Sequence, residues 1–560
     1  MLAPIAPCII NILMESHCLS FRDIPNTTQI FLSFLEDFGS VAPFYAHPPN
    51  EAGVEAASRD VYLNPSVRES VVEILREQNR DLAGGSLDRE TARNLDRLAA
   101  GAFAIVTGQQ VGLFSGPAYS LYKSIAVVHR AAELTEHGVE TVPIFWLATE
   151  DHDLAEVNHS FWNTRNGLVR YDLSPAVENE SRRVGEVVLG NDVRVLAAKA
   201  AGSLEGPFAE EVARALVESY APEETYGSAF GKLMSRLLTG RGVIFLNPLD
   251  ARLHRLAAPT YLRAIEEMDA LREALLARSK DLGQRGLHVQ VRVTNETTLL
   301  FLNVNGRRVP LRERGGKFVA GKITFTPGEL RTLLADTPEA FTANVLLRPV
   351  VQDTLLPTAA YIGGPAEIAY MAQAEIVYKR ILGRMPAILP RPSATLVEPS
   401  VARLLAKYGI DFRDILRGRR NLRGKMEAAS LPRSLTRRFT SDEKALRRLL
   451  RGYQKPLERL DSTLLGALQS SERKMLHQLL KLKGKASRAE GLRTGVLDRH
   501  ERILLDSIYP QRGLQERSLC SLPFLATYGP ELFDAMERSM PPLGEAESSP
   551  CGHKHNILYL

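Results

Sequence analysis

The stretch between residues 102 and 148 constrains the fold of this 560-residue chain more than any other part of its sequence. It opens with a short, continuous apolar run, AFAIV at 102–106, which is typical of a strand buried on both faces of a parallel sheet. A glycine-containing turn and a helical pattern at 118–138 follow, and a second apolar run, VPIFWLA, occupies 142–148. Strand, turn, helix and strand form one βαβ unit, so we expect an α/β core built on a parallel sheet.

Other periodic segments extend this core. Apolar residues at helical spacing predict helices at 29–39 and 66–85, and RGVIFLNP at 241–248 indicates another core strand. HVQVRV and TLLFLNV, within 288–304, alternate like two strands of a sheet-rich insertion near 285–325, and Asn305-Gly306 is a hairpin turn signal. After a helical stretch at 369–382, the proline-rich ILPRPS at 388–393 breaks the pattern.

Between about 399 and 500 the strand signals disappear and leucines recur every three or four residues, which predicts a coiled-coil-like pair of helices. Gly452 and Pro456 interrupt the pattern, so we expect bent antiparallel helices rather than one rod. Residues 401–500 hold 25 Lys and Arg against 10 Asp and Glu, a net charge of +15 in a chain of +5. This basic arm predicts either an anionic partner or docking against the acidic remainder, and charge alone does not choose between them.

The expected organisation has four parts: a disordered extension at 1–17, the core at 18–395, the basic helical arm at 396–500, and a C-terminal segment at 501–560 that returns to the core and ends in a disordered tail. The four cysteines match neither a disulfide framework nor a metal-binding pattern, which favours a reducing compartment. No apolar stretch is long enough to span a membrane, and the N-terminus lacks the basic start of a signal peptide. We therefore expect a soluble, cytoplasmic protein that does not bind membranes.

The turn at 107–117, between the first two apolar strands, is the first candidate site. Such a turn leaves backbone N–H groups unpaired at the positive end of a helix dipole, which suits a phosphate or a carboxylate. Its spacing matches neither a Walker loop nor a GxGxxG fingerprint, and a purely structural turn is the alternative. The lysine on the following helix is placed to meet a phosphate. The binding residues expected here are Thr107, Gly108, Gln109, Gln110, Gly112, Gly116, Tyr119, Tyr122 and Lys123.

A polar cluster directly follows the second apolar strand, at the sheet edge where ligands of open α/β sheets bind. Consecutive ionisable groups there are costly unless something binds them, and both turns should face one crevice. Three interpretations stay open: substrate-ammonium binding or acid–base catalysis, metal chelation by His152, Asp153 and His159, and an internal hydrogen-bonded network. The cluster comprises Glu150, Asp151, His152, Asp153, Asn158 and His159.

A third candidate is the polar stretch at 346–367, which lies in apolar surroundings. Its glycines would let a ligand approach the backbone, with a structural turn as the alternative. Arg391, in LPRPS, offers a fork for a carboxylate or phosphate. The residues singled out in the stretch are Asp353, Tyr361, Gly363, Gly364, Pro365 and Glu367.

Five long motifs occur in an order that resembles one known family: VTGQQVGLFSGPAYSLYKSIAVVHRAAEL, VPIFWLATEDHDLAEVNH, LRPVVQDTLLPTAAYIGGPAEIAYMAQ, MPAILPRPSATLVEP and LQERSLCSLPFLATYGPEL. From about Cys18 to Met536 the chain is similar to the bacillithiol-biosynthesis cysteine-adding enzymes, the BshC family of cysteine ligases. The resemblance implies a Rossmann-like core with inserted connecting segments and a coiled-coil arm that pairs two subunits as a homodimer. It assigns the residues around 107–123 to the family's first core turn and those at 150–153 to its second.

The resemblance further implies a ligase that joins L-cysteine, through its carboxyl group, to the amine of glucosaminyl malate, which yields bacillithiol. A carboxylate and an ammonium do not condense at neutral pH, so the cysteine carboxyl must be activated by a nucleotide, ATP or another, as an adenylate or acyl phosphate. No metal is expected other than Mg²⁺ carried with the nucleotide. We expect phosphates or malate carboxylates near 112–123, and amine recognition or general-base catalysis at Asp151, His152 or Asp153.

Two other functions are the alternatives. A metal-dependent hydrolase or transferase would use the cluster at 150–159. A nucleic-acid-binding protein would use the basic arm, with an affinity that falls steeply with salt. The ligase interpretation instead predicts an arm that mainly pairs two subunits and binds no nucleic acid.

Overall fold

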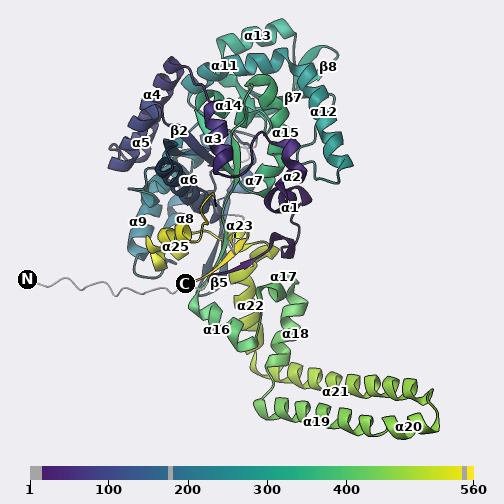
Figure 1. The fold of residues 1–560 in the computed structure, drawn as a ribbon. Helices are drawn as coiled ribbons and strands as arrows, with labels where there is room; N and C mark the ends of the chain where they lie inside the picture. The colour runs from purple at the N-terminus through teal and green to yellow at the C-terminus, as the bar shows by residue number, and fades with distance from the viewer. Residues whose placement is uncertain (1–15, 174–180, 545–551) are drawn as a thin grey trace, which may run out of the picture. The chain divides into compact units, whose positions relative to one another are not determined.

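A five-stranded parallel sheet forms the centre of the larger of two compact units (Figure 1). The computed structural model describes residues 16–173, 181–544 and 552–560, of which 16–394 and 516–556 belong to this unit. The strands lie in the order β13-β12-β2-β3-β6, and every neighbouring pair is parallel. Their bounds are β2 (Phe103–Gln109), β3 (Thr141–Leu147), β6 (Ile244–Leu246), β12 (Thr358–Gly363) and β13 (Ala387–Pro390).

The strand order creates a switch point beside β2. From β2 the chain builds outward on one side through β3 and β6, and then returns to the other side for β12 and β13. In open α/β sheets ligands bind beyond the carboxyl ends of the strands at such a reversal. The gap between the ends of β2 and β12 is therefore the place where the fold predicts a site.

The predicted strands at 102–106, 142–148 and 241–248 are confirmed as β2, β3 and β6, and β3 is buried along its whole length. Burial of both faces explains the unbroken apolar runs, because helices cover the sheet. The helices packed on the strands are α3 (Glu51–Arg59), α4 (Pro65–Leu82), α5 (Arg89–Ala100), α6 (Tyr119–Glu136) and α15 (Pro365–Ile381). The helices expected at 29–39 and 66–85 are also confirmed, as α1 (Gln29–Glu36) and α4.

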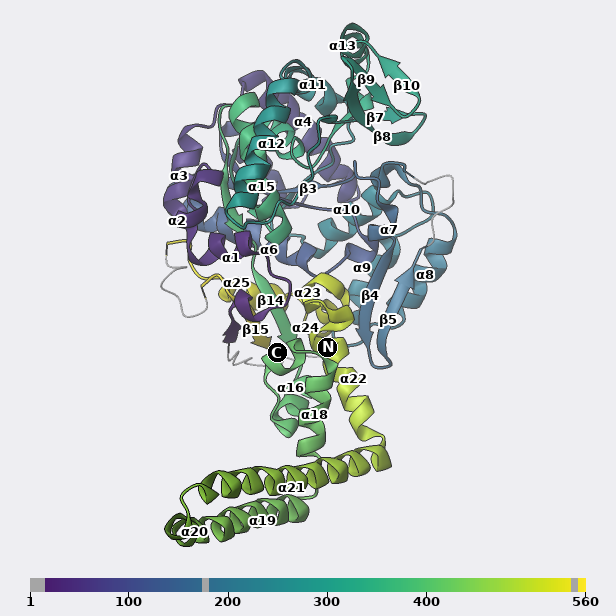
Figure 2. The same cartoon turned by 90° about the vertical axis from the view of Figure 1, so that its right-hand side faces the viewer.

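An antiparallel sheet forms the insertion, and Figure 2 shows it beside α13 at one end of this unit. Asn305 and Gly306 both have positive φ angles, as the predicted hairpin turn requires. The strand expected at 288–293 is wrong: Gln373 pairs with both the N–H and the C=O of Val291, and so takes the place of a neighbouring strand. The sheet order is β10-β9-β8-β7-β11, with β7 (Thr297–Val304), β8 (Arg307–Arg314), β9 (Lys317–Ala320), β10 (Ile323–Phe325) and β11 (Phe341–Ala343).

The other elements lie in the larger unit, except that residues 395–397, 515 and 557–559 belong to the smaller one. The expected disordered start and tail are corrected in part, because β1 (Ser16–Leu19) and β15 (His555–Tyr559) are strands; residues 1–15 and 545–551 lie outside the described residues. The other elements are α2 (Phe38–Val41), α7 (Leu154–Val157), β4 (His159–Thr164), β5 (Gly167–Asp172), α8 (Asp192–Ala201), α9 (Ala209–Ser219), α10 (Tyr226–Leu237), α11 (Ala251–Glu266), α12 (Met268–Gln284), α13 (Pro327–Asp336), α14 (Arg348–Leu355), β14 (Ser393–Val397), α23 (Gln515–Ser518), α24 (Leu522–Tyr528) and α25 (Glu531–Arg538).

The smaller unit, residues 395–515 with 557–560, contains the predicted helical arm. In it α19 (Arg433–Gly452) and α20 (Gln454–Leu460) run alongside the 31-residue α21 (Leu464–Thr494), as Figure 1 shows. The break expected near Gly452 and Pro456 is present between α19 and α20. The expected end of the arm at residue 500 falls inside α22 (Val496–Ile508). The remaining helices are α16 (Pro399–Tyr408), α17 (Phe412–Leu416) and α18 (Arg419–Ala429).

Two sequence expectations about the environment of the chain can be compared with the structure. No helix within the described residues is both long and apolar enough to cross a membrane. Cys520 is a buried free thiol, whereas Cys18 is disulfide-bonded, a pairing that the spacing of the cysteines did not predict.

The turn between β2 and α6 depends on the absence of a side chain at Gly112. A Cβ atom at this position would lie 2.8 Å from the Cα of Gly116, which itself has a φ of +65°. We expect Gly112→Ala to lower the free energy of unfolding by about 1–3 kcal/mol through overpacking. Urea denaturation measures this, with Gly190→Ala as the control because an added Cβ there meets nothing within 4 Å. Equal stability of the two variants would contradict the account.

Candidate functional site

A cavity of about 620 Å³ opens beyond the carboxyl ends of β2, β3 and β12. The turns that follow these strands line it, and Phe301 of β7 and Arg308 of β8 add a wall from the insertion. The two turns that were predicted to share a crevice do so, because Gln110 Nε2 donates to Asp151 Oδ2 at 2.7 Å. The predicted residues that line the cavity are Gly108, Gln109, Gln110, Tyr119, Lys123, Glu150, Asp151, His152, Tyr361, Gly364, Pro365, Glu367 and Arg391.

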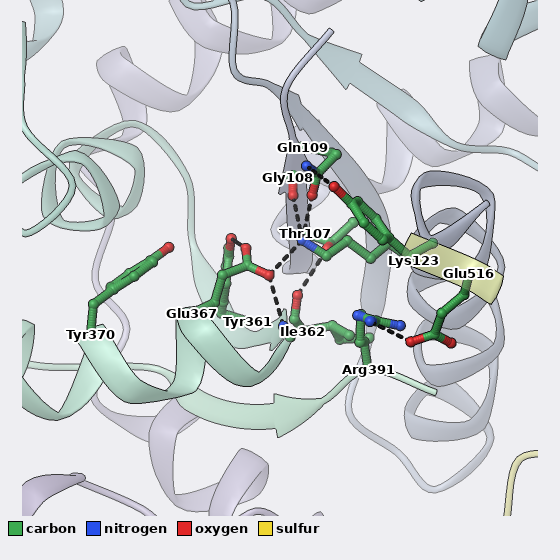
Figure 3. Close-up of polar contacts among 12 residues, drawn as sticks. Thr107, Gly108, Gln109, Lys123, Tyr361, Ile362, Glu367, Tyr370, Arg391 and Glu516 are labelled. Atoms are coloured by element: carbon green, nitrogen blue, oxygen red, sulfur yellow. Dashed lines mark hydrogen bonds and ion pairs between the residues drawn. The ribbon is translucent and has the colours of Figure 1, made fainter. Parts of the chain in front are cut away.

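Lys123 and Glu367 form a buried ion pair across the switch point (Figure 3). The Lys123 side chain is 2% exposed, and its Nζ donates to Glu367 Oε2 at 2.5 Å, to Gly108 O at 2.8 Å and to Gln109 Oε1 at 3.0 Å. Because an ammonium has three N–H donors, all of them are used within the protein. The expectation that Lys123 meets a phosphate is therefore wrong in this geometry: the lysine fastens the end of β2 to the start of α15.

Glu367 is held ionised by this arrangement. Its carboxylate also accepts hydrogen bonds from Tyr361 Oη at 2.6 Å and from Gly364 N at 2.7 Å, which caps α15. Burial opposes ionisation, but Lys123 and these donors outweigh it, so the pKa of Glu367 lies below its usual range. Burial lowers the pKa of Lys123, and the Glu367 carboxylate offsets part of that effect.

Asp151 and His152 are engaged by Arg308 from the insertion. Asp151 accepts from Gln110 and from His152 N at 2.7 Å, and these bonds with the Arg308 charge outweigh burial and hold its pKa well below the usual range. Arg308 Nη1 lies 3.0 Å from His152 Nδ1. The same Nδ1 also lies 3.4 Å from Asp151 Oδ1, so both Arg308 and Asp151 contact this ring nitrogen. The Asp151 carboxylate is therefore already occupied by donors.

Asp153, Asn158 and His159 do not line the cavity. Asp153 caps α7 by accepting from Glu156 N, and His159 Nδ1 lies 3.3 Å from Asn158 Oδ1. The chelating set of the metal alternative, His152, Asp153 and His159, is therefore not brought together. Nowhere in the described residues do three His, Cys, Asp or Glu side chains come close enough to hold a metal ion.

The glycine turn at 111–116 is buried and faces away from the cavity. Phe114 N donates to Tyr220 Oη, Tyr220 Oη donates to Gly112 O, and Gly116 N donates to Leu113 O. These bonds occupy the amides that were expected to hold an anion, which corrects the predicted cradle. The remaining predicted residues contribute to the core and do not line the cavity. Thr107 donates to Ile362 O between β2 and β12, and the buried Asp353 accepts a hydrogen bond from Tyr378. Tyr122 is fully buried, and Gly363 is the last residue of β12.

Besides Arg308, three arginines line the cavity, namely Arg348, Arg391 and Arg517, and only Arg391 was singled out from the sequence. Arg391 pairs with the fully buried Glu516 at 2.6 Å (Figure 3). Arg348, at the start of α14, donates to Gln352 and lies over the rings of Trp146 and Tyr361, at 5.9 and 5.6 Å. Within the described residues no carboxylate lies within ion-pair distance of Arg348, nor of Arg517, which also lines the cavity. These two guanidinium groups are available to an anionic ligand.

Comparison with known proteins extends this description. Residues 14–392 match the family described as "Bacillithiol biosynthesis BshC, N-terminal Rossmann-like domain", and residues 394–549 match its "C-terminal coiled-coil domain". Relatives named "Putative cysteine ligase BshC" are 38% identical in Koribacter versatilis, over 93% of this chain and 97% of theirs, and 36% identical in Solibacter usitatus, over 94% and 98%. A third, from Salinibacter ruber, is 32% identical over 91% and 94%.

The strand order, the polar cavity at the switch point and the helical arm define a Rossmann-like protein with a coiled-coil domain. Both family matches and the relatives agree with this architecture over nearly the whole chain. The chain belongs to the BshC family of bacillithiol biosynthesis.

The Lys123–Glu367 pair generates a stability prediction. Lys123→Met leaves a buried carboxylate unpaired and should lower the free energy of unfolding by about 3–5 kcal/mol. The double variant Lys123→Met with Glu367→Gln should be more stable than this single variant, because the orphaned charge is gone. Urea denaturation of the single and double variants measures both values.

The control for this experiment is Lys232→Met, which breaks a half-exposed pair with Glu224 and should cost about 1 kcal/mol or less. Two results would contradict the role assigned to this ion pair. One is a Lys123→Met variant that is as stable as the control, and the other is a Lys123→Met variant that is as stable as the double variant.

Proposed function

We propose that this chain is a cytoplasmic ligase that joins the carboxyl group of L-cysteine to the amine of glucosaminyl malate, after activation of that carboxyl by a nucleotide. Two things support the proposal: the relatives are named cysteine ligases, and the cavity at the switch point carries guanidinium groups without carboxylate partners. The observation that carries most weight is Arg348, because a partly buried guanidinium with no carboxylate within ion-pair distance in the described residues suits an anionic substrate.

The chemistry sets what the cavity must hold. The amine nitrogen attacks the activated carboxyl carbon and a C–N bond forms. The bond between that carbon and the oxygen attached to phosphorus breaks, so the phosphate group leaves. The reactants carry anionic groups, the malate carboxylates and the phosphates, and two ammonium groups, the amine that reacts and the α-ammonium of cysteine. Holding them in reach of each other converts a bimolecular encounter into an oriented reaction.

Arg348 and Arg517 are the groups to which we assign these anions, because Arg391 is already paired with Glu516. The start of α15 adds the positive end of a helix dipole at Gly364–Ala366, on the same side of the cavity. The nucleotide, ATP or another triphosphate, would arrive with its own Mg²⁺, and the phosphates are placed at these residues rather than at the buried turn of 111–116.

The arm is proposed to pair two subunits rather than to bind nucleic acid. Its helices α19, α20 and α21 expose apolar side chains that a solvated basic helix does not need: Leu435, Leu449, Leu460, Met475, Leu480 and Leu482. Burial of such side chains against a second copy of the arm would stabilise a homodimer.

The reaction is tested with purified protein, L-cysteine, glucosaminyl malate and each of several nucleoside triphosphates, with the thiol product followed by mass. Wild-type protein should form bacillithiol with at least one nucleotide, and Arg348→Met should lower kcat/KM about 10- to 100-fold through a lost charged contact. Arg312→Met, on an exposed part of β8 outside the cavity, is the control. Absence of a thiol product with every nucleotide would contradict the proposal.

Pairing through the arm is tested by gel filtration and a salt-titrated DNA-binding assay. Leu449→Glu combined with Leu482→Glu places charges on two side chains that are 57% and 58% exposed, and should shift the elution from dimer to monomer. Glu substitutions at Arg451 and Lys485 are the control, since they change charge without removing apolar area. Tight DNA binding that weakens steeply with salt would support the nucleic-acid alternative instead.

A further inference from the structure

Glu150 stands out among the carboxylates of the cavity because it accepts no hydrogen bond from the residues that the structure describes. It follows β3 and lines the cavity, its side chain is 11% exposed, and its Oε1 makes no hydrogen bond within the described residues. A buried, unpaired carboxylate costs several kcal/mol, so such a group is expected to gain a cation when its ligand is present. Asp151 and Glu367, by contrast, are already saturated with donors.

His254, on α11, lies next to the Glu150 carboxylate. Its Nε2 lies 3.2 Å from Glu150 Oε1, the residue is 3% exposed, and neither ring nitrogen makes a hydrogen bond within the described part of the chain. The ring of Tyr261 stacks on the imidazole, with centroids 6.4 Å apart. A proton on the carboxylate can therefore be shared with an imidazole that is held in place and screened from water.

The arginines near the Glu150–His254 pair direct their N–H groups at other partners. Arg308 lies close enough to interact with Glu150 electrostatically, but its N–H groups are directed at His152, Thr342 and the carbonyl of Ala343. Arg183, which interacts electrostatically with Tyr261 and Arg308, pairs with Glu186. No Lys or Arg of the described chain lies within ion-pair distance of Glu150, so a substrate ammonium would be its first cationic contact.

We infer that Glu150 binds the ammonium group of the amine substrate and removes its proton, with His254 as the residue that positions Glu150 and shares that proton. The inference rests on the proposed ligase function. The first proton passes from the ammonium to the Glu150–His254 pair, and the free amine then attacks the activated carboxyl carbon. The second proton, released as the C–N bond forms and the C–O bond breaks, leaves with the departing phosphate.

The test separates carboxyl activation from amine deprotonation by using hydroxylamine, which is uncharged at neutral pH and needs no base. Wild-type protein with cysteine and nucleotide should give cysteinyl hydroxamate, and with glucosaminyl malate it should give the thiol product. Glu150→Gln should form hydroxamate at the wild-type rate, while amide formation falls about 100- to 1,000-fold. This loss should shrink as pH rises, because more of the amine is then deprotonated in solution.

His254→Gln should lower kcat for amide formation about tenfold with little change in KM, again with hydroxamate formation intact. His129→Gln, on α6 and outside the cavity, and Glu224→Gln, outside it as well, are the matched controls and should keep both activities. Retained hydroxamate formation also shows that each variant is folded.

The outcomes distinguish a failure of the ligase function from a failure of the role of Glu150. If wild-type protein forms neither product, the ligase function and the role of Glu150 fail together. If wild-type protein forms both products and Glu150→Gln keeps full amide formation, or loses both reactions equally, the function stands and the role of Glu150 is overturned.

Discussion

The ion pair between Lys123 and Glu367 is the contact on which the rest of the site depends. It joins the first helix after β2 to the first turn of α15, across the point where the strand order reverses. Through Gly108, Gln109, Gly364 and Tyr361 it also sets the positions of both turns. Two buried charges are stable only as a pair, so the switch point is held in one geometry, and the cavity beyond it has fixed walls.

The remaining polar groups of the cavity divide into those that hold the structure and those that are open to a ligand. Arg308 ties the insertion to the turn after β3, because it contacts Asp151 and His152 and lies 3.8 Å above the ring of Phe301. Glu516, in the C-terminal segment, forms an ion pair with Arg391 and so holds this side chain in place. Among the described residues, Arg348 and Arg517 have no carboxylate within ion-pair distance and Glu150 has no lysine or arginine there, so we assign these three to the reactants.

The sequence predicted the parts of this arrangement that depend on local patterns. β2 and β3 are buried on both faces, so their apolar runs are unbroken; the alanines and glycines of β12 and the prolines around β13 conceal strands of the same sheet. An edge strand tolerates such prolines because one side needs no ladder partner. The turns at 108–110 and 150–152 were found because ligands of parallel sheets bind at strand ends.

The roles within the site could not be predicted, because they depend on partners far away in the chain. Lys123 meets Glu367 across 244 residues, and His152 meets Arg308 across 156, so neither pairing leaves a local signal. A lysine at the start of a helix after a glycine turn suggests a phosphate ligand until its actual partner is known. His254 lies in an ordinary amphipathic helix, and only the fold brings it behind Glu150.

The most direct test of the central claim is a crystal structure of the protein with glucosaminyl malate bound. The account predicts electron density in the cavity beyond β2, β3 and β12, with the malate carboxylates in contact with Arg348 or Arg517 and the amine within hydrogen-bonding distance of Glu150. Density for this molecule elsewhere, with the cavity unchanged and holding only water, would contradict it.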